Sequence, residues 1–269
     1  MSRGRLLMAL VVAVISVIGY FSKSAFNPIT EEKQHVAGIT PEQEVALGLQ
    51  AAPEMLQQFG GPDPDPQAQA LVRRVGERLV SRSAASQSPY RFEFHLLDDP
   101  QTINAFALPG GQVAITEGLL RRLETEGQLA GVLGHEIGHV VARHGAEHIA
   151  KQQLTEGLTG AAVLATYDPN NPSSRGSAAV AAMIGQLVTM RFGRQDELES
   201  DDLGVRLASE AGYDPRSMIG LMKILAQSSE GGAPPEFFST HPNPENRVQR
   251  IEEAIQKRFP DGVPEGLEK

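Results

Sequence analysis

The segment His135-Glu136-Ile137-Gly138-His139 constrains the fold of this chain more than any other part of its sequence. It lies in a proline-free stretch, from residue 126 to about residue 154, whose apolar residues recur at three- and four-residue intervals. That period predicts an α-helix with a buried face. Thr125 is the expected N-cap, with Gln128 in the capping-box position. The fold must therefore place two histidines one turn apart on the same side of a helix.

The residue types of this HExxH segment suit a metal site. Imidazoles four residues apart on a helix can bind one Zn²⁺ together, and Glu136 can reach a metal-bound water without binding the metal itself. A lone histidine on a helix is usually an ordinary structural side chain, but two histidines with an intervening glutamate favour a metal. We expect one Zn²⁺ per chain, with His135 and His139 as ligands and Glu136 as the base.

A catalytic zinc needs a third protein ligand. Residues 194–202 offer one, because they place Glu197 and Asp201 four residues apart on an expected helix. We predict that Glu197 binds the metal and that Asp201 accepts the outer N–H of a ligand histidine, which fixes the orientation of that ring. The alternative is that these carboxylates form a solvated helix face with Arg194. Glu199 is expected to face solvent.

The composition excludes several functions. At 269 residues and 41% hydrophobic content the chain can bury a core, and we expect one catalytic domain with an N-terminal appendage. The net charge is −9 and no Lys/Arg cluster lies outside the N-terminus, so we expect no nucleic-acid partner. The chain has no cysteine, which excludes disulfides, thiolate zinc ligands and a cysteine nucleophile.

The N-terminus has the pattern of a membrane-directed segment. Arg3 and Arg5 precede an uninterrupted apolar run at residues 6–21, and Lys23 follows it. The run is short for a transmembrane helix and long for a signal-peptide core, so residues 1–25 are a membrane anchor or a cleaved signal. The lack of a clean A-x-A site favours the anchor. The charge bias predicts a catalytic domain on the periplasmic side, either anchored to the membrane or secreted after cleavage.

Turn and cap residues divide the rest of the chain. We expect a tether at 26–39, a folded domain at 40–259 and a frayed polar tail at 260–269. Strands are expected at 90–96 and on both sides of the Pro-Gly-Gly turn at 109–111. Helices are expected at 40–58 with a kink or restart at Pro53, after residue 66, at 116–122, 195–211, 215–228 and 244–259. Residues 157–190 are expected to form two apolar helices around a polar break at 168–176.

Two further predictions concern residues near the expected site. His144 and His148 fall on the expected HExxH helix, where we interpret them as surface residues or as residues behind the metal ligands, not as a second metal site. The strand after Pro-Gly-Gly carries small residues that allow close backbone approach, so an extended peptide could pair with its edge. We therefore expect four residues of this strand to bind substrate: Gly111, Gln112, Val113 and Ala114.

Four segments, in this order, resemble the M48 family of zinc metalloproteases, particularly its soluble-domain bacterial branch. They are residues 104–111, the HExxH residues 135–139, the helix with Glu197 and Asp201, and residues 239–242 together with Arg247. The resemblance covers roughly residues 40–258. It implies an α+β, zincin-like compact metalloprotease domain, mostly helical with a small sheet, in which His135, His139 and Glu197 bind zinc.

The resemblance also implies a role for His241. A histidine at this position in relatives lies close to the metal, where it occupies the open site or stabilises the transition state. The sequence by itself makes His241 a loop residue before a proline-started helix, and that alternative stays open.

The expected function follows from these residues and from that resemblance. We expect a zinc-dependent endopeptidase that cleaves protein or peptide substrates in envelope protein quality control, with Glu136 activating the zinc-bound water. Substrate recognition is expected within the catalytic domain or from a partner. The alternative is a latent zinc-containing chaperone or assembly factor for envelope proteins, in which His241 or a loop keeps the site inactive.

Overall fold

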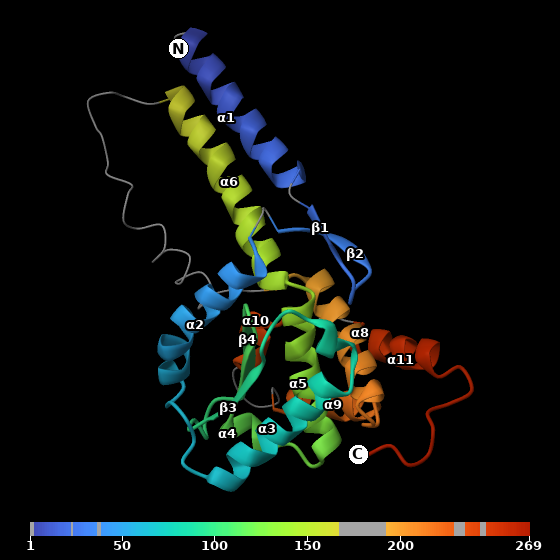
Figure 1. Ribbon diagram of the computed structural model, residues 1–269. Coiled ribbons are helices and arrows are strands. Elements are labelled where there is room, and N and C mark those ends of the chain that lie inside the picture. The colour runs from blue at the N-terminus through green and yellow to red at the C-terminus, as the bar shows by residue number, and fades with distance from the viewer. Residues whose placement is uncertain (1–2, 23, 37–38, 167–191, 229–234, 243–245) are drawn as a thin grey trace.

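The computed structural model describes residues 3–22, 24–36, 39–166, 192–228, 235–242 and 246–269. Within these ranges the helices are α1 (Arg3–Ser22), α2 (Pro41–Gln58), α3 (Pro66–Ser81), the 3-10 helix η1 (Ala84–Gln87), α4 (Glu117–Leu120), α5 (Glu126–Val141), α6 (His144–Thr166), α8 (Arg194–Glu210), α9 (Ser217–Gln227), α10 (Phe237–Thr240) and α11 (Arg247–Arg258). The strands are β1 (Ser24–Asn27), β2 (Glu32–His35), β3 (Glu93–Leu97), β4 (Ala105–Leu108) and β5 (Gln112–Thr116). The expected α+β fold, mostly helical with a small sheet, is confirmed (Figure 1).

Strand β5 is the centre of a three-stranded sheet of order β3-β5-β4. β3 pairs with it in parallel and β4 pairs with it antiparallel. The predicted Pro-Gly-Gly turn joins β4 to β5, and Gly110 and Gly111 adopt φ angles of 84° and 107°, which favour glycine. The strand expected from residue 90 begins only at Glu93. Glu93 pairs with Gln112, the first residue of β5, so residues before Glu93 have no partner on β5.

Helix α5, which carries the HExxH segment, lies at the centre of the domain. It contacts β4, β5, α3, α8 and α9. Its residues from Gly127 to Val141 are all buried, so a helix that we expected to bury one face is enclosed by protein on every side. The expected start is confirmed, because the Thr125 hydroxyl accepts a hydrogen bond of 3.2 Å from the N–H of Gln128.

Small residues let α5 and α8 lie directly against each other. A Cβ added at Gly138 would lie 3.0 Å from the carbonyl oxygen of Ser200, and one at Gly134 would lie 3.4 Å from the carbonyl oxygen of Gly204. The hydroxyl of Ser200 also donates to the carbonyl of His135 at 3.1 Å. This close packing brings the acidic side chains of α8 to the histidines of α5.

Helix α5 ends at Val141, which corrects the prediction of one continuous helix to about residue 154. The backbone turns at Arg143, whose φ is 57°, and α6 begins at the next residue. The Arg143 guanidinium donates to Glu44 at 3.0 Å and to the carbonyl of Ile39 at 2.7 Å. Because both partners come from about a hundred residues earlier in the chain, no local pattern marks this break.

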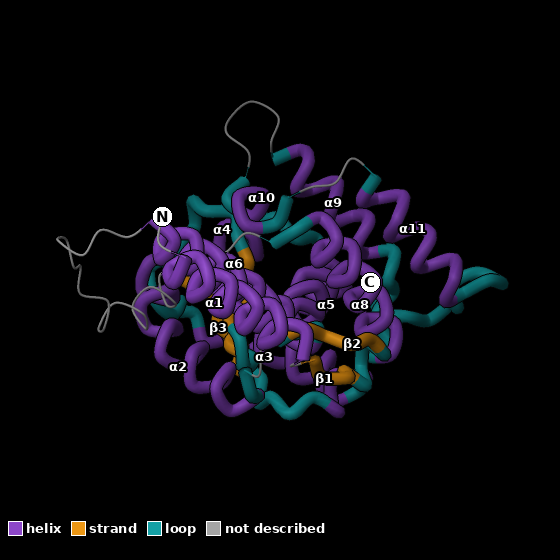
Figure 2. Tube along the Cα trace, turned by 90° about the horizontal axis from the view of Figure 1, so that it is seen from above, coloured by secondary structure: helices purple, strands orange, loops and turns teal. Residues whose placement is uncertain are grey.

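Helix α1 runs beside α6, as both views show (Figures 1 and 2). Figure 1 shows that the pair projects from the rest of the molecule. Several large apolar side chains of α1 are exposed: Leu7, Met8, Leu10, Val11, Val14, Ile15, Val17, Ile18 and Phe21. Among the described helices, none combines the length and the hydropathy that a bilayer span requires.

Two segments that we expected to lack structure are held against the domain. The range interpreted as a tether contains all of β2 and the end of β1, which pair as an antiparallel hairpin that begins at Ser24. The Asn27 amide donates to the carbonyl of Val141 at 2.6 Å. Near the other end, the N–H of Glu268 donates to the carbonyl of Gly212 at 3.1 Å, and its carbonyl accepts from Asp214 at 2.7 Å. These long-range hydrogen bonds replace the expected disorder.

The remaining helices follow the sequence prediction closely. Helix α2 passes through Pro53 as one element, so the helix does not restart there as one of the two expectations had it. Helices α8, α9 and α11 begin and end within three residues of their expected bounds. Helix α6 covers the first part of the apolar stretch up to Thr166. The predicted polar break at 168–176 and the apolar helix after it lie outside the described residues.

Candidate metal centre

Four ionisable side chains from α5, from α8 and from the residue after α10 converge in the interior. The Nε2 atoms of His135 and His139 lie 3.1 Å apart, and the Glu197 carboxylate oxygens lie 3.6 and 3.4 Å from them. Two ligand atoms bound to one tetrahedral zinc are about 3.3 Å apart, so these separations suit a single metal ion. His241 completes the group, whose ligand atoms all lie within 4.8 Å of one another.

Asp201 orients the first histidine. Its Oδ1 lies 2.9 Å from Nδ1 of His135, the position that we predicted from the sequence. Nδ1 therefore carries the proton, and Nε2 faces the cluster with its lone pair. Arg247, which is 1% exposed, binds Asp201 through Nε at 2.7 Å and Nη2 at 2.9 Å, and its Nη1 lies 3.1 Å from Glu197. One buried guanidinium thus holds the carboxylates of both Asp201 and Glu197 in place.

The second histidine contacts His144, which confirms one of the two interpretations of that residue: it lies behind a metal ligand and not at the surface. Nδ1 of His139 lies 2.8 Å from Nδ1 of His144, whose Nε2 lies 3.3 Å from Glu199. Glu199, which we expected to face solvent, is half-buried because of this contact. The ring of Phe192 also stacks on the imidazole of His139, with a distance of 3.8 Å between the ring centroids. In the sequence, the histidine five residues after His139 was the only local indication of this contact. His144 reaches His139 only because the helix breaks at Arg143.

Glu136 and His241 present unpartnered polar atoms to each other. Both carboxylate oxygens of Glu136 are buried without a hydrogen-bond partner among the described residues, and so is Nε2 of His241. Oε1 of Glu136 lies 3.6 Å from that Nε2. The imidazole is positioned by Phe237, whose ring stacks on it, and by Glu197, which lies 3.0 Å from its Nδ1. The structure thus places His241 in the metal cluster rather than in a remote loop.

Burial and charge give the two glutamates different proton affinities. Burial raises the pKa of Glu136 above its ordinary value. Burial also acts to raise the pKa of Glu197, but hydrogen bonds from His139 and His241 outweigh that effect and lower the pKa of Glu197 well below its ordinary value. Glu197 is therefore a carboxylate suited to a cation, whereas Glu136 is suited to accept a proton.

The donor set fits a metal such as zinc. Two imidazole nitrogens and one carboxylate are the protein ligands of known catalytic zinc sites. The unprotonated Nε2 of His135 lies 3.1 Å from Nε2 of His139, and this contact between two nitrogens is favourable when a cation lies between them. Both carboxylate oxygens of Glu136 are buried without a hydrogen-bond partner in the described part of the chain, which is costly, and a water molecule held by a cation would satisfy them.

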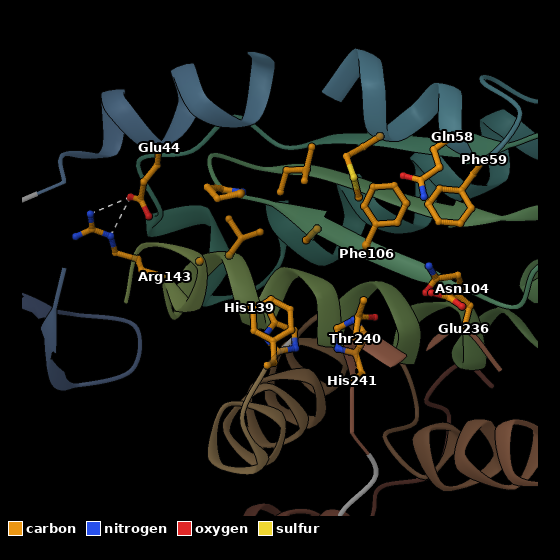
Figure 3. A pocket seen from close by; sticks show the side chains of 17 residues that line it. Glu44, Gln58, Phe59, Asn104, Phe106, His139, Arg143, Glu236, Thr240 and His241 are labelled. Carbon is orange, nitrogen blue, oxygen red and sulfur yellow. Dashed lines mark hydrogen bonds and ion pairs between the residues drawn. The ribbon is translucent and has the colours of Figure 1, made fainter. Parts of the chain in front are cut away.

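A cleft opens onto this cluster. Figure 3 shows His139 and His241 on one wall and Phe106 of β4 on the opposite wall. The ion pair between Glu44 and Arg143 closes one end of the cleft. The cluster is therefore buried but is reached from one side, along β4.

The predicted substrate strand requires a correction. Gln112, Val113 and Ala114 belong to β5, which is buried along its whole length and is paired on both edges. The carbonyl of Gly111 accepts the N–H of Glu93 at 2.9 Å. An incoming peptide therefore finds no open edge on β5, because strand order, which the local pattern does not encode, placed it in the middle.

The open edge belongs to β4 instead. No other described strand pairs with its outer side, which borders the cleft. The N–H of Thr116 donates to the carbonyl of Asn104 at 3.0 Å. Because hydrogen bonding alternates along an antiparallel pair, the backbone groups of Ala105 and Ala107 point to the outer edge.

A buried HExxH helix that faces a glutamate of a second helix, beside the edge of a small sheet, is the arrangement of the zincin class of metallopeptidases. Comparison with known families agrees with this class and narrows it. Residues 66–255 match the family model of peptidase family M48, and the chain belongs to that family.

The chain is similar to several named proteases. It is 36% identical over 195 residues to the beta-barrel assembly-enhancing protease of Escherichia coli strain K12. The matched region covers 68% of this chain and 38% of the relative. It is 32% identical over 238 residues to the mitochondrial metalloendopeptidase OMA1 of Schizosaccharomyces pombe. Here the matched region covers 87% of this chain and 67% of the relative. The chain therefore spans well under half the length of the Escherichia coli protein.

Proposed function

We propose that this chain is a zinc-dependent endopeptidase that cleaves protein or peptide substrates. The observation that supports this most directly is the geometry of the cluster. His135, His139 and Glu197 point donor atoms at one position, and the unpartnered carboxylate of Glu136 lies beside them. Family membership and the two relatives described above, both named as proteases, support the same assignment.

The proposed mechanism assigns each residue one task. When bound, a zinc ion supplies Lewis acidity, which lowers the pKa of a water molecule and polarises a carbonyl. His135, His139 and Glu197 would hold the ion. Glu136 takes the proton of the attacking water on a carboxylate oxygen and delivers it to the nitrogen of the leaving amine. Its burial, which raises its pKa, helps it to keep that proton between the two transfers.

His241 is the proposed donor to the developing oxyanion. Its Nε2 is buried and unpartnered among the described residues, and it lies 3.6 Å from Oε1 of Glu136. A donor that faces the position where negative charge develops stabilises the transition state more than the ground state. Its stacking on Phe237 keeps the ring aimed at that position.

The proposed substrate is an extended peptide that pairs with the outer edge of β4. Ala105 and Ala107 direct backbone groups to this edge, and the cleft continues along it. Replacing Ala107 with proline removes one N–H from that edge. We expect the Ala107→Pro variant to raise KM with a smaller change in kcat; unchanged kinetics in a folded variant would contradict the pairing.

The proposed cellular setting is protein quality control at the envelope. Support comes from the relatives named for beta-barrel assembly and from the apolar N-terminal segment. We propose that α1 anchors the chain to the membrane, with the catalytic domain on the periplasmic side. Secretion to the periplasm after removal of the segment is the alternative. Exposed apolar side chains on α1 and the arginines before the apolar run support the anchor.

The deciding experiment compares the full-length wild type with Glu136→Gln. Zinc is measured by elemental analysis, and cleavage is measured with casein. We expect about one zinc per chain in both proteins and cleavage by the wild type alone, because the amide that replaces the carboxylate cannot take a proton but leaves all three ligands in place. Absence of zinc from folded wild-type protein would overturn the proposal.

A latent zinc-containing chaperone or assembly factor is the second candidate. The observation that favours it is the position of His241, whose Nδ1 lies 3.0 Å from Glu197 and 3.4 Å from Nε2 of His135. A histidine so close to the ligands can take the open coordination position. His241→Ala distinguishes the two functions, because it lowers cleavage if His241 stabilises the oxyanion and raises cleavage if His241 blocks the site.

A further inference from the structure

We propose that His144 and Glu199 form a positioning pair that fixes the tautomer and the orientation of the metal ligand His139. The pair would act on the second ligand as Asp201 acts on the first. This inference rests on the metal site of the proposed function and names the residues that prepare one half of it.

The three side chains form a continuous line. Nδ1 of His139 lies 2.8 Å from Nδ1 of His144, and Nε2 of His144 lies 3.3 Å from Oε2 of Glu199. His139 and His144 are 2% and 1% exposed, so water does not compete for their ring nitrogens. Glu199 is half-buried and reaches this line from α8, beside the ligand Glu197.

The positions of the protons follow from this geometry. Nε2 of His139 faces the metal position, and a neutral imidazole can bind a metal there only if its proton is on Nδ1. Nδ1 of His139 must then donate, so Nδ1 of His144 must accept. The proton of His144 is left on Nε2, where it donates to the Glu199 carboxylate. Each ring nitrogen of His139 and His144 therefore has one role, as metal ligand, donor or acceptor. The Glu199 carboxylate fixes this assignment because it can only accept a hydrogen bond.

The contact depends on the break between α5 and α6. Residues five apart on a continuous helix are about 140° apart around its axis, so their side chains cannot meet. The turn at Arg143 redirects α6 and brings His144 back toward His139. The two ligand histidines therefore receive equivalent support from different sources: His135 directly from Asp201, and His139 through an intervening imidazole.

The test measures the zinc affinity of full-length variants by competition with a chromogenic chelator. His144→Leu removes the acceptor, and we expect it to weaken zinc binding by about 10- to 100-fold. His144→Asn keeps an oxygen close to the former Nδ1 position, and we expect it to restore affinity to within about threefold of the wild type. Equal zinc affinity of folded His144→Leu and wild type would overturn the proposal, as would equal losses in the leucine and asparagine variants.

Glu199→Ala is the second variant, because a half-buried side chain at the surface can be removed without leaving a closed cavity. We expect a several-fold weaker zinc affinity, and no change would overturn the role of the carboxylate. Its matched control is Glu147→Ala, a half-buried α6 glutamate that contacts His35 and Lys151 instead. For the histidine, the control is His95→Leu on β3, a half-buried histidine whose Nε2 lies 2.8 Å from Oε1 of Gln112 and which is not one of the four cluster residues.

A second readout needs neither zinc nor activity. Imidazole ¹⁵N shifts of the metal-free protein report which nitrogen of His139 carries the proton. We expect Nδ1–H in the wild type and a mixture of tautomers in His144→Leu; a single unchanged tautomer would contradict the inference. If the wild type binds no zinc, the proposed function fails. If the wild type binds zinc and all variants bind it equally, only the positioning pair fails.

Discussion

The phenyl ring of Phe192 lies flat on the imidazole of His139, with ring centroids 3.8 Å apart and planes inclined by 22°. The N–H of Phe192 donates to the carbonyl of Thr240 at 3.0 Å. Phe192, two residues before the start of α8, thus connects a metal ligand on α5 with the segment that carries His241. The stack also covers one face of His139 where the cleft reaches the cluster.

Replacing Phe192 with alanine should loosen this face of the site. Loss of a buried phenyl ring costs about 3–5 kcal/mol of unfolding free energy, and the exposed ring of His139 should give up zinc more readily. We expect zinc release to EDTA to accelerate several-fold in Phe192→Ala and much less in Phe192→Leu, followed with a fluorescent chelator. Equal release rates in all three proteins would show that the stack does not protect the metal.

Arg247 should be the most sensitive buried charge of the domain. Its removal leaves the carboxylates of Asp201 and Glu197 without their cation, and breaking a buried pair costs about 3–5 kcal/mol. Arg247→Lys keeps the charge but cannot bind Asp201 through two N–H groups, so its cost should be about half as large. Urea unfolding of the metal-free proteins measures both values, and a fully stable alanine variant would contradict this prediction.

Gly48 should tolerate no side chain. A Cβ there would lie 1.9 Å from the carbonyl oxygen of Pro109, a backbone atom of the turn that borders the cleft. We expect Gly48→Ala to lower the unfolding free energy by about 2 kcal/mol, although alanine favours helix formation. Gly19→Ala is the matched control, because that helical glycine has no heavy atom within 4 Å of its added Cβ. Thermal unfolding should separate the two variants.

Glu210 should make stability depend on acid pH. Burial acts to raise the pKa of Glu210, but hydrogen bonds from Ala84 and Arg206 outweigh it and hold that pKa below its ordinary value, with Arg258 adding to the effect. A lowered folded-state pKa stabilises the protein above the unfolded-state pKa, and the stabilisation is lost as pH falls through the folded value.

We therefore expect Glu210→Gln to be about 1 kcal/mol less stable than the wild type at pH 7. The difference should shrink as pH falls from about 5 to 3, in melting curves of the metal-free proteins. A difference that stays constant over this range would mean that the carboxylate charge contributes nothing.

Local sequence patterns predicted the elements whose geometry is set by neighbouring residues. Thr125 caps α5 as expected, and the spacing of His135 and His139 places their Nε2 atoms together because one helical turn separates them. The glycines after Pro109 form the turn between two strands for the same reason: their backbone angles are a local property. The approach of Asp201 to His135 also matched the prediction, since both helices were identified correctly.

Contacts between distant segments decided the rest. The sequence could not show that β5 lies between β3 and β4, so it assigned the substrate edge to the wrong strand. Nor could it show that Glu44, 99 residues before Arg143, helps to end α5 and so brings His144 to His139. A helix, a cap or a turn depends on interactions within a few residues. Contacts between distant surfaces of the folded chain decide the order of the strands and the helix ends that ion pairs fix. They also decide which side chains orient the metal ligands.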